Sequence, residues 1–184
     1  MVRRLRSILV LLHLATGFGW LAAGLAVLLL GWHGERAAAL RVDDLLLADL
    51  SFMTVYTGLM LAGLGPWGYT RHRWVLVKLG LAVGCALGGR AVLPGLLAAP
   101  GHELRLVVVV TVGALALGTM AWLGRTKPGA RPRAGGVPPC TQPTWYVVAL
   151  VTPVLDYTSG LPLQGFPAAA VLARHAWFAL RPAR

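Results

Sequence analysis

Hydrophobic residues along this chain are gathered into four long runs that short polar segments separate. The runs cover residues 7–30, 45–64, 74–93 and 104–123. A helix rises 1.5 Å per residue, so about 20 residues match the ~30 Å hydrocarbon core of a bilayer. The fourth run starts with valines that would suit a strand, but an open strand in lipid leaves backbone groups unpaired. The pattern predicts an all-α, polytopic membrane protein with a four-helix bundle over residues 1–124.

Helix-breaking residues mark the ends of the second and third runs. Gly65-Pro66-Trp67-Gly68 follows the second run, and Pro94-Gly95 closes the third. The first run follows Arg3, Arg4 and Arg6, as the apolar part of a signal peptide would. A signal peptide has an apolar region of only about 7–15 residues, so we expect this longer run to remain as a span.

The tail over residues 125–184 differs from the rest of the chain. Residues 125–143 are rich in Pro, Gly and Arg, which is typical of a solvated linker. Residues 145–155 are apolar but too short to span, and Pro153 interrupts them. Residues 168–180 fit a short amphipathic helix on the membrane surface, disorder fits them equally well, and a fifth, re-entrant element stays open as an alternative. We therefore expect the membrane domain to end near residue 124, with a disordered or interfacial tail.

Composition supports lipid as the solvent of the apolar runs. Of the 184 residues, 57% are hydrophobic and 12% are charged, whereas soluble domains usually carry about 25% charged residues. The formal charge is +11, and the basic residues lie mainly at the ends of the runs and in the tail. That distribution suits anionic lipid headgroups and argues against nucleic acid as a partner. The preference for Arg over Lys, with abundant Ala, Gly and Leu, indicates a high-GC bacterial genome.

Basic residues near the run ends predict the orientation in the membrane. One side carries Arg3, Arg4, Arg6, Arg71, Arg73, Arg125, Lys127, Arg131 and Arg133, and the other carries Arg36, Arg41 and Arg105. Cytoplasmic segments are enriched in Lys and Arg. We expect a multi-pass protein of the cell membrane with both termini in the cytoplasm.

Motifs of known catalytic or metal-binding chemistry are absent from the sequence. It contains no P-loop, no Gly-x-Ser-x-Gly, no His-Glu-x-x-His and no Cys-x-x-Cys-His. The two cysteines, Cys85 and Cys140, form no redox motif, and Cys85 reads as a small buried hydrophobe. The sequence leaves enzyme activity open and favours its absence, and we expect no cofactor, with haem b as the alternative.

Three glycines on the third run recur at four-residue spacing. Gly80, Gly84 and Gly88 share one face of a helix, and their missing side chains allow another helix to approach closely. This pattern predicts a packing face, toward a helix of the same chain, a second protomer or another membrane protein.

Ionisable residues inside the runs are the candidates for function. For His13 we favour a neutral imidazole that is bonded to a Ser, Thr or backbone group of a neighbouring helix. Lys78 lies close to the start of the third run, where its long side chain reaches the interface. Asp49 and Arg90 lie at matching depth, and we expect them to form an ion pair between the second and third runs.

Two further histidines lie in the outer segments. His33 and His102 are near Asp43, Asp44 and Glu103 in those segments, and His with carboxylate ligands can hold a metal ion. Their spacing matches no compact metal motif, so the preferred interpretation is solvated loop residues.

The chain resembles the bacterial membrane proteins of the copper-resistance protein D-like group, and within it an uncharacterised actinobacterial family. Leu12-His13 with Gly19-Trp20 and Gly24, and the segment 71–79 (RHRWVLVKL), carry the resemblance, which covers residues 5–124. The group includes copper-uptake proteins and a haem-containing protoporphyrinogen oxidase, and the resemblance implies cofactor-binding roles for His13 and Lys78. That oxidase has another His after the Lys, whereas residues 79–89 here contain none.

The expected function is that of a packing or partner module, or of a transporter-like accessory protein, with membrane lipid and another protein or a second copy as partners. Two alternatives stay open. One is a b-type haem redox protein that uses His13 as an axial ligand. The other is a copper-handling permease component that uses His13, His33 or His102, although it lacks the Met and Cys clusters that soft copper sites prefer.

Overall fold

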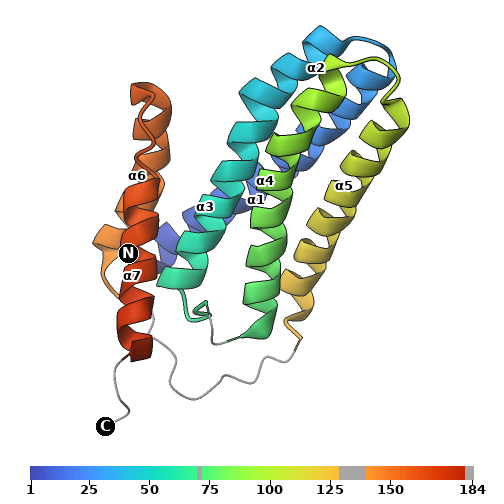
Figure 1. The fold of residues 1–184 in the computed structure, drawn as a ribbon. Helices are drawn as coiled ribbons and strands as arrows, with labels where there is room; N and C mark the ends of the chain where they lie inside the picture. Colours follow the sequence, from blue (N-terminus) through green and yellow to red (C-terminus); the bar gives the residue numbers. More distant parts are fainter. Residues whose placement is uncertain (70–71, 129–139, 181–184) are drawn as a thin grey trace. The chain divides into compact units, whose positions relative to one another are not determined.

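The computed structural model of the chain describes residues 1–69, 72–128 and 140–180 (Figure 1). Within these ranges the regular structure is helical, without strands. The elements are α1 (Val2–Trp32), α2 (Arg36–Val42), the π-helical turn η1 (Asp43–Leu47), α3 (Ala48–Leu64), α4 (Arg73–Ala98), α5 (Glu103–Thr126), α6 (Pro143–Ser159) and α7 (Gly165–Leu180). The all-α prediction is confirmed for this part of the chain.

Four helical stretches in the described ranges are long and apolar enough to cross a membrane. They are Val2–Trp32, Arg36–Leu64, Arg73–Ala98 and Glu103–Thr126. Each contains one of the four predicted runs, so the number of candidate spans and their order along the chain agree with the prediction. The chain is accordingly a multi-pass membrane protein.

The second span begins nine residues before the expected start at Leu45, because α2, η1 and α3 form one continuous helical stretch from Arg36. The sequence between Arg36 and Thr57 contains neither Gly nor Pro, so nothing interrupts the backbone hydrogen bonds. Asp43 and Asp44, which we had placed in an outer segment, therefore lie within this helical stretch.

The third span also extends beyond its predicted end. Pro94 lies inside α4, which continues to Ala98. Proline removes only the hydrogen bond that its own nitrogen would donate to the carbonyl of Arg90, and a membrane helix tolerates such a loss. Gly101, with φ of 83°, then forms the turn that leads to α5.

The tail contains two helices, so the prediction of disorder is wrong for residues 143–159 and 165–180. α6 starts with Pro143, continues through Pro153 and ends at Gly160, whose φ of 68° suits glycine. α7 covers the expected helix over 168–180, and its place on the membrane surface stays a prediction. Residues 70–71, 129–139 and 181–184, which include much of the predicted basic linker, lie outside the described residues.

The contacts divide the chain into two compact units. Unit 1 comprises Met1–His13, Tyr56–Leu79 and Lys127–Arg184, and unit 2 comprises Leu14–Val55 and Gly80–Thr126. Lys127–Arg184 belongs to the same unit as parts of α1, α3 and α4, and the expected end of the membrane domain near residue 124 stays a prediction. Helices α1, α3 and α4 contribute residues to both units.

Unit 2 has a hydrophobic core to which segments of all four spans contribute. Its buried members are Trp20, Ala23, Val27, Ala39, Leu47, Ala86, Leu93, Leu97, Leu106 and Val110. Gly31 marks a close approach, since a Cβ at this position would lie 2.5 Å from Leu106 Cδ2 and 3.3 Å from Leu97 Cδ2. Close packing at this end of unit 2 thus depends on a glycine that the sequence analysis did not select.

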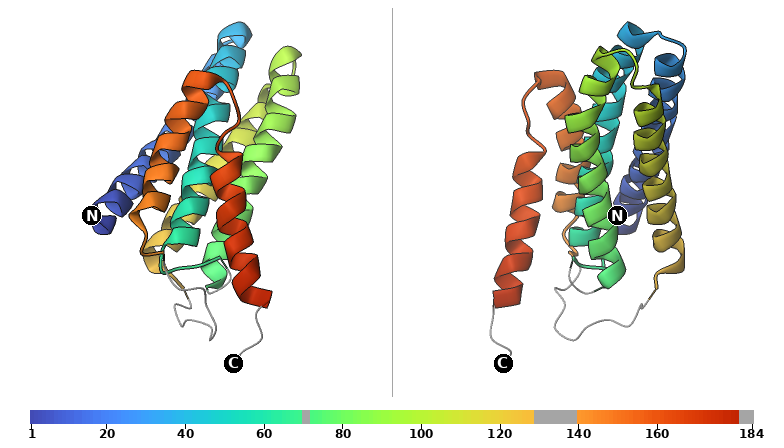
Figure 2. Two further views of the ribbon diagram at one scale, coloured as in Figure 1. Left: turned by 90° about the vertical axis from the view of Figure 1, so that its left-hand side faces the viewer. Right: turned by 45° about the vertical axis from the view of Figure 1, so that its right-hand side comes forward.

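In unit 1 the tail binds the C-terminal end of α3. The carbonyl of Leu64 accepts hydrogen bonds from the Tyr146 hydroxyl and from the Cys140 backbone N–H, both at 3.0 Å. The last carbonyls of a helix have no partner within it, so these two donors satisfy a group that would otherwise be costly to bury. α6 and α7 lie side by side as a helical hairpin (Figure 2), and Val171 of α7 packs against Gly63 of α3.

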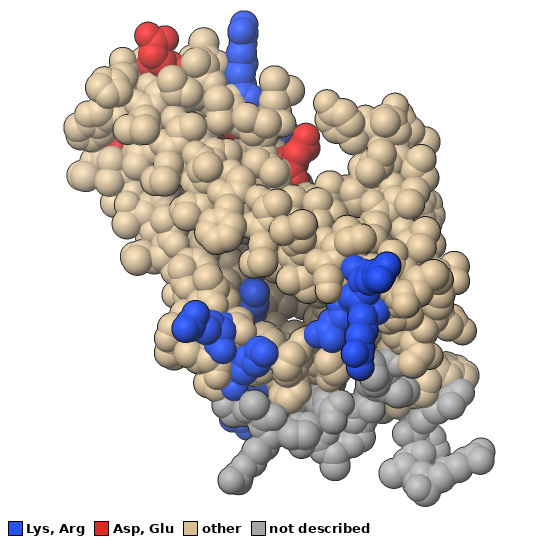
Figure 3. Space-filling view, turned by 180° about the vertical axis from the view of Figure 1, so that it is seen from behind, with Lys and Arg blue, Asp and Glu red and all other residues tan. Residues whose placement is uncertain are grey.

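Most of the molecular face in Figure 3 is uncharged, and charged side chains occupy only small patches of it. Large hydrophobic side chains such as Phe18, Leu115 and Trp122 are exposed. An exposed apolar surface of this kind matches lipid better than water.

Candidate functional site

A cavity of about 340 Å³ lies inside unit 2 and is the strongest candidate for a functional site. Every one of the four spans contributes to its wall. The residues that bear on its chemistry are Trp20 of α1, Asp43 of η1, Ser51 of α3 and Cys85 and Arg90 of α4, while α5 supplies mainly valines. Most of the wall is apolar, with a few polar groups, as in many small-molecule sites.

Glycines create the space. Gly84, Gly88 and Gly113 all line the cavity, and a Cβ at any of them would meet no atom within 4 Å among the described residues. Gly84 and Gly88 are also exposed, so the cavity reaches the surface of unit 2 along this face of α4. In the described part of the chain the Gly80, Gly84 and Gly88 face therefore does not mark a close helix crossing, and its use by a second protomer or another protein stays a prediction.

Asp43 is the buried charged group of the cavity wall. Asp43 is 3% exposed and lines the cavity. No hydrogen bond to its carboxylate is found among the described residues, and Arg90 acts on it electrostatically. A carboxylate inside a membrane span is costly unless something compensates its charge, which makes Asp43 a functional candidate.

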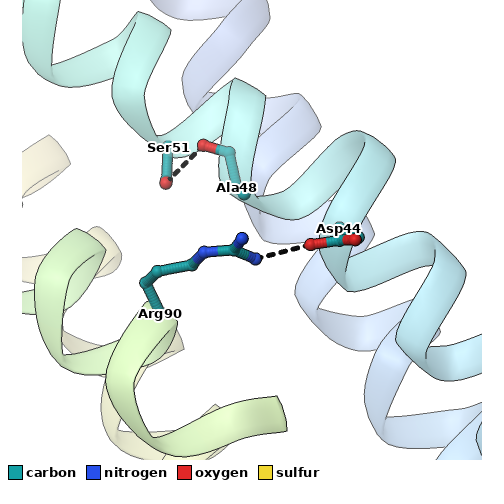
Figure 4. Close-up of polar contacts among 4 residues, drawn as sticks. All are labelled: Asp44, Ala48, Ser51 and Arg90. Carbon is teal, nitrogen blue, oxygen red and sulfur yellow. Dashed lines mark hydrogen bonds and ion pairs between the residues drawn. The ribbon is translucent and has the colours of Figure 1, made fainter.

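Arg90 also lines the cavity, and its hydrogen-bonded partner is Asp44. The guanidinium Nη1 donates to Asp44 Oδ1 at 2.6 Å, and both side chains are partly exposed (Figure 4). The predicted pair with Asp49 is corrected: Asp49 acts on Arg90 only as a more distant charge. The helix continues upstream of Leu45, and this extension places Asp44 opposite α4.

Ser51 completes the polar part of the cavity wall. Its hydroxyl donates to the carbonyl of Ala48 at 2.7 Å within the same helical stretch (Figure 4). The hydroxyl oxygen keeps lone pairs that can accept a hydrogen bond. Ser51 is buried, so a donor group of a bound molecule would find it inside the cavity.

His13 lies in unit 1 and not in this cavity. Its Nδ1 is 2.9 Å from the hydroxyl oxygen of Thr57, which is fully buried. The imidazole also packs against α3, where a Cβ at Gly58 would lie 3.1 Å from His13 Cε1. A hydrogen bond to a threonine of a neighbouring helix is the contact that we favoured for this residue.

Lys78 is half-buried in unit 1, and it forms no hydrogen bond or ion pair with a described residue. A common cofactor site of His13 and Lys78, which the resemblance implies, stays a prediction. Residues 79–89 of α4 contain no histidine, so this helix does not supply a second axial ligand for a bis-histidine haem.

The outer histidines are not gathered into a metal site. His33 is exposed and His102 is half-buried. The described residues contain no group of three or more His, Cys, Asp or Glu side chains that could hold a metal ion. Glu103 instead accepts a hydrogen bond from Arg36 at 2.7 Å, which links α2 to α5 within unit 2.

The sequence analysis does not identify Ser51 as a site residue, and it places Asp43 and Asp44 in an outer segment rather than in a span. The signal that would have placed them in a helix is the uninterrupted absence of Gly and Pro between Arg36 and Thr57.

Comparison of the chain with protein-family models, with curated proteins and with solved structures gives no match.

Proposed function

We propose that this chain is an accessory protein of the bacterial cell membrane, without enzyme activity of its own, which binds a lipophilic small molecule in the cavity of unit 2. The observation that carries this proposal is the cavity itself, which all four spans line. In this proposal the spans form a four-helix bundle whose interior is a binding site.

The size and lining of the cavity support a small-molecule ligand. Its volume of about 340 Å³ is within the range of about 300–1,000 Å³ that is usual for ligand pockets. The wall is mainly apolar, and it is exposed along Gly84 and Gly88. A ligand dissolved in the bilayer can therefore enter sideways between lipid and protein without passing through water.

Charge distribution supports the orientation in this proposal. Of the described basic residues, seven belong to unit 1 and five to unit 2, whereas all described acidic residues except Asp156 belong to unit 2. With Lys- and Arg-rich segments in the cytoplasm, the proposal places both termini in the cytoplasm.

Photoaffinity labelling tests the proposal. The protein is reconstituted in phosphatidylcholine vesicles and labelled with a series of dodecyl probes that carry a diazirine in the chain and differ only in their head group. We expect at least one probe to label the cavity-lining parts of α4 and α5 saturably, with labelled residues identified by mass spectrometry.

Two glycine variants provide the control. Gly84→Leu places a side chain in the cavity and should abolish saturable labelling, whereas Gly80→Leu, one turn earlier on α4 and outside the cavity wall, should not. Labelling that does not saturate with any probe, or that is equal in both variants, would refute the proposal. So would disulfide cross-linking between two copies of the chain that carry Gly84→Cys or Gly88→Cys, because a second protomer would then occupy the opening.

A further inference from the structure

The charges around the cavity identify the class of ligand. Asp43 lines the cavity with a buried carboxylate that has no hydrogen bond within the described residues. Among the described residues, the cation in the cavity wall is Arg90, which is engaged by Asp44 at 2.6 Å. Asp49 adds a third acidic group whose charge acts on Arg90. Arg90 thus interacts with three acidic residues, by a hydrogen bond with Asp44 and electrostatically with Asp43 and Asp49.

The position of Asp43 makes its negative charge available to a ligand. A carboxylate in an apolar, water-poor surrounding attracts a cation strongly because the effective dielectric constant is low. The indole of Trp20 lines the same cavity, and indole is the side chain that best attracts a cation placed over its ring. The remaining wall is apolar and suits a hydrocarbon chain or ring system.

We infer that the ligand is a lipophilic organic cation with a single positive charge, such as a quaternary ammonium amphiphile, whose charge is compensated by Asp43. This inference rests on the proposed function and specifies its ligand. A monovalent cation removes the cost of the buried Asp43 carboxylate and leaves the Arg90–Asp44 pair intact. An anionic ligand would have to displace Asp44 from Arg90 and would bring its own charge close to Asp43.

The decisive probe pair differs in charge alone. One probe is a dodecyl diazirine with a trimethylammonium head, and the other has the uncharged tert-butyl head, in which carbon replaces the nitrogen. We expect the ammonium probe to saturate the cavity of the unmodified protein at a concentration about tenfold lower than its uncharged isostere. A dodecyl carboxylate probe should be the weakest of the series.

Variants test whether Asp43 causes the preference for the ammonium probe. Asp43→Asn should reduce the ratio between the saturating concentrations of the uncharged and the ammonium probe to about one. Asp49 lies outside the cavity wall, so Asp49→Asn should keep most of this ratio. Arg90→Gln should increase the preference, because it removes the compensating cation. Each variant is first compared with the unmodified protein by circular dichroism and gel filtration, and the comparison of the two probes on the unmodified protein needs no variant.

The outcomes separate this inference from the proposed function. If both probes label the cavity saturably and equally, and Gly84→Leu abolishes both signals, the lipophilic site stands and the cation preference is refuted. If the carboxylate probe binds best and Arg90→Gln abolishes its labelling, the ligand is an anion and the inference is wrong. If no probe saturates, both the inference and the proposed function fail.

Discussion

Arg90 of α4 donates a hydrogen bond to Asp44 of η1, with 2.6 Å between the nitrogen and the oxygen. This bond joins the third span to the second within unit 2. It also determines which of two adjacent carboxylates is engaged: Asp44 pairs with Arg90, while Asp43 lines the cavity as the buried neighbour. The carboxyl group inside the candidate site is therefore that of Asp43, because Asp44 is engaged by Arg90.

The Arg90–Asp44 pair can be tested with a double-mutant cycle. Arg90→Gln and Asp44→Asn should each lower the Tm slightly, and the double variant should lower it no further than either single variant, because each change removes the same bond. The effect should be small, since both side chains are partly exposed. Asp49→Asn is the matched control, and coupling of Arg90 to Asp49 as strong as its coupling to Asp44 would contradict this assignment.

Tyr146 should contribute to the stability of unit 1 through one buried hydrogen bond. The side chain is 2% exposed, and its hydroxyl donates to the Leu64 carbonyl. Tyr146→Phe should lower the free energy of unfolding by about 1 kcal/mol, because the carbonyl keeps only the Cys140 N–H as a donor. Chemical denaturation in detergent measures this, with Tyr157→Phe on the exposed side of α6 as the control. Equal stability of the two variants would show that the tail does not bind α3 in this way.

Gly63 should be essential for the packing of α7 in unit 1. A Cβ at this position would overlap Val171 Cγ1 and would lie 2.5 Å from the Tyr69 hydroxyl oxygen, which itself donates to the Leu59 carbonyl. Gly63→Ala should cost about 1–3 kcal/mol through this overlap, and limited proteolysis should then cleave the tail faster. Gly118→Ala, in open space on α5, is expected to leave cleavage unchanged.

The packing of α7 should weaken in acid because of His175. The ring lies 4.5 Å from that of Tyr69, and Nδ1 is 3.0 Å from the Val171 carbonyl oxygen. Burial lowers the pKa of His175 below its ordinary 6.5, with Arg174 in support and the Val171 hydrogen bond in opposition.

A histidine whose pKa is lower in the folded than in the unfolded protein binds its proton more weakly in the folded state. The contribution of His175 to the stability of the folded state is therefore complete above pH 6.5 and is lost as the pH falls below that value. Protease cleavage of the tail should be severalfold faster at about pH 5 than at neutral pH. His175→Gln should remove this dependence, and a dependence that persists in the variant would exclude His175 as its origin.

The purified protein should show no Soret absorption band. The proposed function includes no haem, and residues 79–89 supply no second histidine to pair with His13 as an axial ligand. An absorption spectrum and a metal analysis of detergent-purified protein measure this directly. A Soret band that His13→Ala abolishes would favour the haem alternative and overturn the proposed function.

The sequence by itself determined the four spans and their order, because hydrocarbon thickness and the need to pair every backbone group act on each run separately. The element boundaries were less accurate. The charges at 43 and 44 predicted an outer segment and Pro94 predicted a helix end, but the helical backbone continues through both places.

Only the tertiary structure decided which residues meet. The contact of His13 with Thr57, the choice of Asp44 over Asp49 by Arg90, and the binding of Tyr146 to the end of α3 join positions 44, 46 and 82 residues apart in the chain. Such contacts depend on how the helices rotate and pack, which hydropathy does not encode. The same packing leaves glycine faces uncovered in unit 2 and so creates the cavity that contains Asp43.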